Sequence, residues 1–337
     1  MDYPGRQKRL RNALQARGVE ALLVTHLPNV RYLCGFTGSS GVLVLGRRTL
    51  FLTDGRYTQQ AREEVLGARV VIAKGSPLAA AVRALSQARV RRVGFESQHL
   101  SVATLASLRG LLPKARLQPL SGVVEGLRMV KEEEEVEQIE AAVVLASSLF
   151  DGVARSIAPG VPESHIAAEL EHAARRAGAQ GMSFETIVAA GARSALPHGR
   201  ASSQPVPNKG FVILDFGVIL SGYCSDMTRT LYVGKPSARA RKLYEAVRKA
   251  QAAAVREVRP GASAGQVDRA ARRVLERAGL GRYFTHSTGH THPRLHTFVN
   301  DYAGILAALG HSQAEIDAQI QALLAEYGVK LTEDDSK

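Results

Sequence analysis

An imperfect internal repeat limits the folds that are open to this chain. Each copy consists of a long predicted helix, a Pro-Gly pair, a second helix and an Ala-Gly pair, followed by β-rich sequence. The pairs are Pro159-Gly160 and Ala177-Gly178 in the first copy, and Pro260-Gly261 and Ala278-Gly279 in the second. A period of about one hundred residues that occurs only twice is too long and too few for a solenoid. The repeat therefore predicts two related halves of one domain, with any active site at their interface.

The part of the chain before the repeat predicts a separate α/β domain. Short apolar strands such as Ala21–Val24 alternate with helices, and Val42–Leu45 and Thr49–Leu52 form a hairpin. Alternation of this kind indicates a partly parallel sheet covered by helices. We place this domain at residues 1–125. The second domain begins at 129, where the acidic segment Lys131–Glu135 opens a long helix whose dipole favours negative charge.

Composition and charge exclude several classes of protein. The chain has 337 residues, of which 45% are hydrophobic and 22% charged, as is usual for a globular protein of two domains. No apolar run approaches the length that crosses a bilayer, so we expect no membrane partner. Only two cysteines are present, in unrelated contexts, which predicts no disulfide framework and a reducing cytoplasm.

The net charge of +13 raises the question of a nucleic-acid partner. Arginines are spread over every predicted helix and aromatic residues are only 5% of the chain, whereas nucleic-acid binders cluster basic residues and interleave aromatics. The pattern predicts an arginine-rich surface with weak nonspecific binding to polyanions, and no specific nucleic-acid partner. A polyanion-binding module remains the alternative.

The segment Phe211–Val233 has two apolar runs around a turn at Leu220–Gly222, which predicts a β-hairpin. Asp215 and Asp226 lie at similar distances from the turn and are expected to face each other, with Cβ atoms about 5 Å apart. Carboxylates this close repel unless they share a proton or a cation, and Asp215 lies in an apolar run where an unpaired charge is costly. One or two metal ions, such as manganese, cobalt or zinc, resolve both problems. Alternatively, Arg229 neutralises Asp226 and Asp215 caps a turn.

Two other segments carry histidines in contexts that suit a site. Thr285–His290 contains His286 and His290 four positions apart, and Ser194–Gly199 places His198 on a loop shaped by proline and glycine. Loops held by a scaffold commonly carry functional residues. The alternative for each histidine is a structural role with a satisfied hydrogen bond.

Taken together, these segments resemble the M24 family of metallopeptidases, in particular bacterial Xaa-Pro aminopeptidases and Xaa-Pro dipeptidases. The segment Phe184–Gly199, the hairpin Leu214–Thr230 and Phe284–His290 occur in the order of the family's motifs. Gly35–Ser39 and Thr53–Tyr57 are similar to the creatinase-type N-terminal domain. The resemblance covers residues 1–290. It implies an α/β creatinase-type N-terminal domain and an α+β pita-bread catalytic domain at 129–290.

The resemblance also implies a reaction and its residues. Two divalent metal ions hold a water or hydroxide that attacks the peptide bond before proline. Manganese is the preferred metal, and cobalt and zinc are the alternatives. Asp215, Asp226 and His290 would be metal ligands. His198 would contact the substrate and stabilise the tetrahedral intermediate, and His286 would line the site. The implied partners are peptides with proline in the second position and a second copy of the chain in a homodimer.

Beyond His290 the sequence departs from the family pattern, which supplies two glutamate ligands, one of them before a Pro-Gly pair. Residues 291–337 contain no Glu-Pro-Gly, and their apolar spacing predicts an atypical helical tail. Glu333 is a candidate replacement metal ligand and His296 a candidate substrate contact. The alternatives are an acidic chain end and an exposed loop histidine.

The departure leaves a second function open. We expect the pita-bread domain to be incomplete at its C-terminal end. A site with two carboxylates and one histidine can hold one ion, whereas a dinuclear pair needs further ligands. The alternative function is therefore an M24 relative that binds one metal ion or none and has little peptidase activity.

Overall fold

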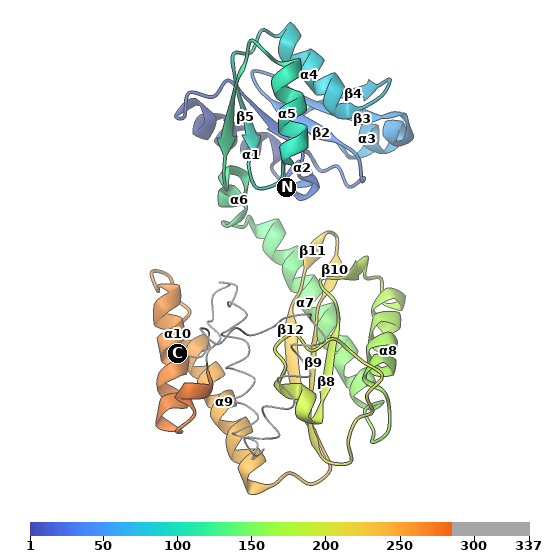
Figure 1. The fold of residues 1–337 in the computed structure, drawn as a ribbon, viewed down its shortest axis with the longest axis vertical. Helices are drawn as coiled ribbons and strands as arrows, with labels where there is room; N and C mark the ends of the chain where they lie inside the picture. The colour runs from blue at the N-terminus through green and yellow to red at the C-terminus, as the bar shows by residue number, and fades with distance from the viewer. Residues whose placement is uncertain (285–337) are drawn as a thin grey trace, which may run out of the picture. The chain divides into compact units, whose positions relative to one another are not determined.

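The computed structural model describes residues 1–284, and Figure 1 shows the course of the chain. The chain divides into two compact units, Met1–Val136 and a unit that starts at Glu137. Among the helices of the described range, none combines the length and apolar character that crossing a bilayer requires.

A six-stranded sheet forms the centre of the first unit, in the order β4-β3-β2-β1-β5-β6. Its pairs β1–β5, β5–β6 and β3–β4 are parallel, whereas β1–β2 and β2–β3 are antiparallel. The predicted partly parallel sheet is therefore confirmed. The strands are β1 (Ala21–Val24), β2 (Val42–Leu45), β3 (Thr49–Asp54), β4 (Arg69–Ala73), β5 (Arg92–Glu96) and β6 (Arg116–Leu120).

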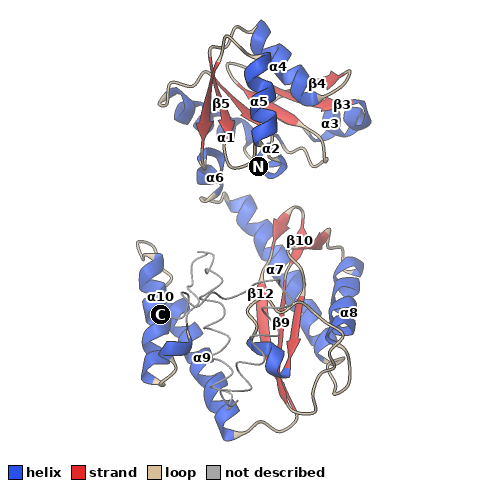
Figure 2. Ribbon diagram, viewed as in Figure 1, coloured by secondary structure: helices blue, strands red, loops and turns tan. Residues whose placement is uncertain are grey.

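Helices cover this sheet, as Figure 2 shows, and two apolar clusters form the core. One cluster includes Leu10, Leu33 and Phe51, and the other includes Leu52 and Leu85. The helices are α1 (Tyr3–Gln15), α2 (Leu27–Cys34), the short η1 (Gly55–Tyr57), α3 (Thr58–Glu64), α4 (Pro77–Gln87), α5 (Val102–Leu111) and α6 (Val123–Arg128).

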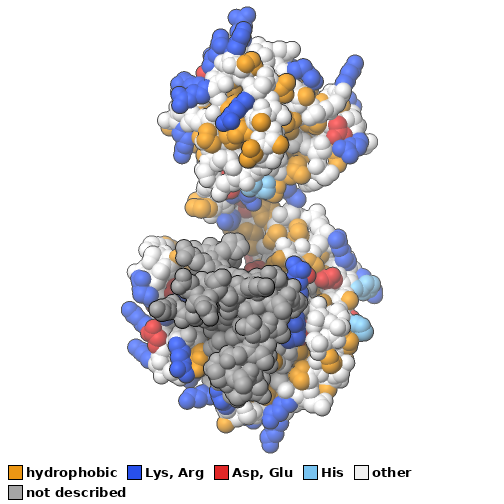
Figure 3. Space-filling model, in the orientation of Figure 1, with side chains coloured by type: hydrophobic (Ala, Val, Ile, Leu, Met, Phe, Trp, Pro, Cys, Tyr) orange, Lys and Arg blue, Asp and Glu red, His pale blue; other side chains and the backbone are white. Residues whose placement is uncertain are grey.

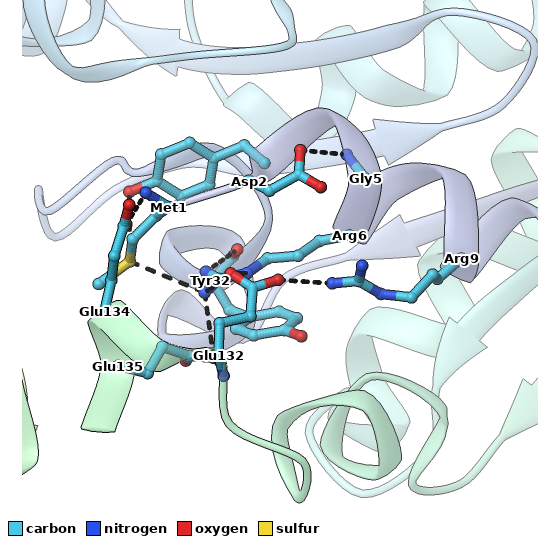
Figure 4. Close-up of polar contacts among 10 residues, drawn as sticks. Met1, Asp2, Gly5, Arg6, Arg9, Tyr32, Glu132, Glu134 and Glu135 are labelled. Atoms are coloured by element: carbon cyan, nitrogen blue, oxygen red, sulfur yellow. Dashed lines mark hydrogen bonds and ion pairs between the residues drawn. The ribbon is translucent and has the colours of Figure 1, made fainter. Parts of the chain in front are cut away.

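The acidic segment at the start of the long helix α7 (Glu133–Ala154) meets a buried arginine of α1 (Figure 4). The guanidinium of Arg6 is fully buried and lies 2.8 Å from Glu132 and 3.1 Å from Glu135. It also donates to the carbonyl of Tyr32 at 3.0 Å and lies over the ring of the same residue. The acidic residues therefore neutralise a buried cation of the first unit, in addition to suiting the positive end of the helix dipole.

In the second unit, α7 and α8 (Glu163–Arg176) pack on a twisted pair of small sheets (Figure 1). The sheets have the orders β12-β9-β8 and β11-β10-β7. Apolar side chains of both layers, among them Ala146, Ile166 and Phe216, form the core. The strands are β7 (Gly181–Met182), β8 (Ile187–Ala190), β9 (Gly210–Phe216), β10 (Val218–Leu220), β11 (Tyr223–Cys224) and β12 (Met227–Val233), and a short helix η2 (Gly191–Ala195) follows β8.

The helical part of the predicted repeat is present. Helix α9 (Ala238–Glu257) precedes α10 (Ala264–Arg277) as α7 precedes α8, and α8 and α10 have 14 residues each. The glycines of all four pairs, Gly160, Gly178, Gly261 and Gly279, have positive φ. Each pair therefore makes the same left-handed turn at a helix boundary. The predicted capping box of Ser263 and Gln266 is also present. After the short helix η3 (Gly281–Tyr283), the rest of the second copy lies outside the described residues.

Candidate metal and substrate site

The predicted hairpin exists, but its register differs from the prediction. Asp215 on β9 is opposite Thr228 on β12, and Asp226 lies two positions before Thr228, just outside the strand. The predicted direct pairing of Asp215 with Asp226 is therefore wrong. The two aspartates are diagonal neighbours, a position that places Cα atoms about 7–8 Å apart in a regular ladder.

The turn explains the shift in register. Leu220 pairs with Tyr223, so Ser221 and Gly222 alone form the turn, with φ of 49° and 75°. Two-residue hairpin turns with positive φ at both positions fit the twist of the flanking strands. The prediction paired Asp215 with Asp226, whereas a turn of Ser221 and Gly222 places Thr228, two positions later, opposite Asp215.

A close approach of the two strands breaks the hairpin beside the aspartates. A Cβ atom on Gly217 would lie 1.8 Å from the carbonyl oxygen of Ser225. Val218 donates its N–H to the Ser225 hydroxyl at 2.9 Å, where a regular ladder would use a carbonyl. The strands can therefore pass from one small sheet to the other at this point, and Asp226 lies at the break, exposed to solvent.

Asp215 has the electrostatic properties expected of a cation ligand. Its Oδ1 atom is buried and has no hydrogen-bond partner among the described residues. Burial raises the pKa of Asp215; the Thr228 hydroxyl opposes this by donating a hydrogen bond, the charge of Asp226 raises the pKa further, and the charge of His198 lowers it. A buried carboxylate oxygen without a donor is costly unless a proton or a cation satisfies it. The arrangement of Asp215 and Asp226 therefore fits a divalent metal ion.

Two more buried side-chain oxygens, without a hydrogen-bond partner in residues 1–284, lie in the segment between β7 and β8. They are Ser183 Oγ and Thr186 Oγ1. Ser183 donates its backbone N–H to Gly217, and Thr186 precedes Ile187, which is opposite Asp215. Sequence analysis did not identify these two hydroxyls. The sequence gives no sign of them, because their place near Asp215 depends on how β8 pairs with β9.

Arg229 does not neutralise Asp226 in the part of the chain that the structure describes. Its guanidinium donates to the carbonyl of Thr228 at 2.9 Å and lies over the ring of Phe150, 6.0 Å from its centre. The alternative in which an ion pair with Arg229 accounts for Asp226 therefore has no support in the described geometry.

The structure brings together only some of the predicted site residues. His198 lies on the exposed turn after η2, and its charge acts on Asp215. The other predicted residues, His286, His290, His296 and Glu333, lie outside the described residues, as does the predicted helical tail. Within residues 1–284, no group of three histidine, cysteine, aspartate or glutamate side chains is arranged to hold a metal ion.

A cavity of about 470 Å³ lies at the other end of β9 and β12. Residues from both halves of the repeat line it, including Phe211 and Tyr232 from the sheet and Lys242 and Leu280 from the helices. Among the described residues, neither aspartate lines it, nor does any other acidic residue or any histidine. We therefore assign the candidate site to Asp215 and Asp226, where a buried polar atom is unsatisfied, and not to this larger space.

The chain matches two family models in consecutive segments. Residues 6–130 match the Creatinase/Prolidase N-terminal domain, and residues 137–297 match Metallopeptidase family M24. The predicted fold class is thereby confirmed, as a creatinase-type N-terminal domain followed by an M24 catalytic domain. The expectation that the second domain is incomplete at its C-terminal end concerns residues outside the described range.

Individual relatives are peptidases. The chain is 39% identical over 284 residues to "Uncharacterized peptidase YqhT" of Bacillus subtilis, which covers 84% of this chain and 80% of that protein. It is 31% identical over 286 residues to an Xaa-Pro dipeptidase of Pyrococcus horikoshii, with coverage of 84% and 80%. Among solved structures, an Xaa-Pro dipeptidase from Bacillus anthracis has a TM-score of 0.83 at 36% identity, covering 86% of this chain and 81% of that one.

Proposed function

This chain belongs to the M24 family of metallopeptidases, and we propose that it hydrolyses the peptide bond before a proline with the help of two divalent metal ions. Peptidases of the family are generally dinuclear metal enzymes. The observation that carries the proposal is the buried Oδ1 of Asp215, which has no hydrogen-bond partner in residues 1–284 and lies near the exposed Asp226. These two residues would hold the ions, because carboxylate oxygens suit manganese, and also cobalt and zinc.

The metal ions and the side chains around them would have separate roles in the reaction. The metal pair, when bound, supplies a hydroxide nucleophile at neutral pH and polarises the substrate carbonyl. His198, on its exposed turn, would donate a hydrogen bond to the carbonyl oxygen of the substrate as negative charge develops there. Beyond the described range, His290 and Glu333 would complete the metal ligands, and His286 and His296 would line the substrate site.

The proposed preference for proline rests on the names of the relatives. The dipeptidases of Pyrococcus horikoshii and Bacillus anthracis carry Xaa-Pro in their names, and the same specificity is proposed for this chain. The substrates would be peptides with proline in the second position. We also infer a cytoplasmic enzyme, from its two unpaired cysteines, and a homodimer, from the family resemblance.

The first test is the metal content of the purified full-length chain after equilibration with manganese, together with hydrolysis of Gly-Pro. Two ions per protomer and turnover of Gly-Pro are the expected result. The Asp215→Asn variant serves as control and should lose both. One ion or none, with no turnover, would overturn the proposal in favour of the alternative, an M24 relative with an impaired metal site.

A further inference from the structure

Glu163 is a fully buried carboxylate to which the mechanism above gives no part. It lies at the first position of α8, far from Asp215 in sequence, and its exposed fraction is 0%. Buried glutamates are rare unless every oxygen is paired. The partners of Glu163 are therefore informative, because they show what this carboxylate holds in place.

All of these partners belong to the loop that carries His198. Glu163 Oε1 accepts the backbone N–H of Ala190 at 2.8 Å, where β8 ends and the loop begins. Glu163 Oε2 accepts the Arg193 guanidinium at 3.0 Å, inside η2. The same oxygen accepts the backbone N–H of Ser202 at 3.1 Å and its hydroxyl at 2.6 Å, where the loop returns.

One carboxylate thus joins three points of this loop, at its start, within η2 and at its return. His198 lies between the second and third points, on a turn closed by a weak bond from Gly199 to Leu196 at 3.3 Å. Arg193 also donates to the carbonyl of Arg200 at 2.7 Å, which brings the two arms of the loop together. Charge-assisted hydrogen bonds of this kind are the stronger ones, and burial excludes competing water.

The Cβ environment of Gly199 supports a fixed loop path. A Cβ atom there would lie 3.1 Å from Leu196 Cβ and 3.2 Å from Ala189 Cβ, so the turn after His198 runs tightly against β8. Ile187 and Arg200 also form an isolated antiparallel bridge. The loop is therefore held on the edge of β8 opposite to β9, and Ile187 lies between Arg200 on one side and Asp215 on the other.

We propose that Glu163 is a positioning residue, which holds the loop of residues 190–202 against β8 and thereby fixes the place of His198 near the candidate metal site. This inference rests on the proposed function, because the contact of His198 with the substrate is itself proposed. Glu163 acts only through the loop: it accepts hydrogen bonds from both arms and touches neither metal nor substrate. Outer partners of this type commonly change activity 10–100-fold when they are removed.

The test compares Glu163→Gln with a matched control, Glu169→Gln. Glu169 lies on the same helix and is exposed, so the control removes the same charge from α8 without touching the loop. In full-length protein labelled with ¹³C-histidine, the His198 ring signal is identified as the one of ten histidine signals that His198→Gln removes. We expect this signal to broaden or shift in Glu163→Gln and not in Glu169→Gln.

Ser202→Ala separates positioning from a direct charge effect. It removes a hydroxyl donor from the loop and leaves the charge of Glu163 in place, so a smaller change of the His198 signal in the same direction is expected. Ser202→Ala is also the variant to measure if Glu163→Gln does not fold. An unchanged His198 signal in whichever of the two variants folds would overturn the proposal.

Kinetics supply a second measurement on the same variants. For Gly-Pro hydrolysis, Glu163→Gln and His198→Gln should each lower kcat/KM by about 10–100-fold. The double variant should be no slower than His198→Gln alone, because both changes remove one interaction. A double variant whose loss in kcat/KM equals the product of the two single losses would overturn the proposal. If the unmodified chain does not hydrolyse Gly-Pro, the proposed function fails, and the His198 signal still decides the role of Glu163.

Discussion

At the scale of single residues, Asp215 combines a cost in stability with a proposed role in metal binding. Its buried oxygen without a partner and its raised pKa both mean that the ionised side chain is poorly accommodated when no cation is bound. Residues that bind ligands are commonly placed at the expense of stability in this way. Both observations imply that Asp215 lowers the stability of the protein without metal and raises it when a metal ion is bound.

In the absence of metal, Asp215→Asn should stabilise the protein at neutral pH. The native pKa of Asp215 is raised above the ordinary 3.8, so the folded state binds this proton more tightly than the unfolded state does. Stability is therefore lost as pH rises from 3.8 through the native pKa, and the amide avoids that loss. We expect a higher Tm for the variant at pH 7 in EDTA, and a difference that disappears below pH 4.

Thr228→Val provides the control for this experiment, because it removes the hydroxyl that lowers the pKa of Asp215 and should reduce the Tm at pH 7. With saturating manganese the unmodified protein should become more stable than Asp215→Asn, since that variant lacks a proposed metal ligand and gains no binding energy. An Asp215→Asn variant that is less stable than the unmodified chain at pH 7 in EDTA would contradict the expectation.

At the scale of elements, the hairpin depends on the absence of a side chain at Gly217. A Cβ atom there would meet the Ser225 carbonyl oxygen at 1.8 Å, which requires the strands to separate. Gly217→Ala should cost about 1–3 kcal/mol in the free energy of unfolding. It should also weaken manganese binding, because Asp226 follows Ser225 directly. Both are measurable by urea titration and isothermal calorimetry.

Gly152→Ala is the matched control within the same unit. Gly152 lies inside α7 with nothing within 4 Å of its Cβ position. Replacement of a helical glycine by alanine should stabilise the protein by about 0.5–1 kcal/mol and leave metal binding unchanged. Equal effects of the two substitutions on stability would show that the close approach at Gly217 does not matter.

A second element-scale prediction concerns the buried arginine of α1. Arg6→Met leaves Glu135, whose side chain is only 4% exposed, beside an apolar group in place of its cation. Loss of one partner of a buried ion pair costs about 3–5 kcal/mol. Arg9→Met removes another arginine that contacts Glu132, but Arg9 is 48% exposed, so its loss should cost under about 1 kcal/mol. Hydrogen exchange of the α1 amides measures both, and similar losses of protection would contradict the prediction.

Elements with a clear pattern were predictable from the sequence, and those that depend on tertiary context were not. The strands β1 and β2 have the predicted bounds because they are short apolar runs. The strand β6 contains Pro119, which by itself argues against a strand, yet β6 is at the sheet edge, where proline is tolerated. The helix α2 is only eight residues long, but Pro28 at its start and Gly35, with φ of 85°, at its end mark its boundaries.

The candidate site was predictable in part for the same reason. Asp215 and Asp226 stand out because charges in an apolar hairpin demand an explanation, so their types and approximate positions could be inferred. Their register could not, because a serine at positive φ in the turn is uncommon, and the turn that it forms with Gly222 places Thr228, two residues after Asp226, opposite Asp215. Glu163 gave no signal, since the partners of its carboxylate are distant in the sequence.

At the scale of the whole molecule, each compact unit has its own apolar core. The first contains the clusters around Leu10 and Leu52, and the second contains the cluster around Ile166 and Phe216. The candidate metal ligands of the described range belong only to the second unit. Binding energy should therefore stabilise the strands beside the site directly, and not the first sheet.

Manganese should accordingly increase hydrogen-exchange protection in β8, β9 and β12 and leave the protection of β1 and β5 unchanged. At a free concentration of 100 times Kd, one bound ion adds about 2.7 kcal/mol to the stability of the state that binds it. This corresponds to a roughly 100-fold slower exchange of amides that open only when the site is lost. Asp226→Asn is the control, because it removes an exposed carboxylate without disturbing the core, and it should abolish the change. Increased protection of β1 and β5 as well as of β8, β9 and β12 would mean that the two units unfold together. No increase in either set of strands would mean that the aspartates do not bind the ion.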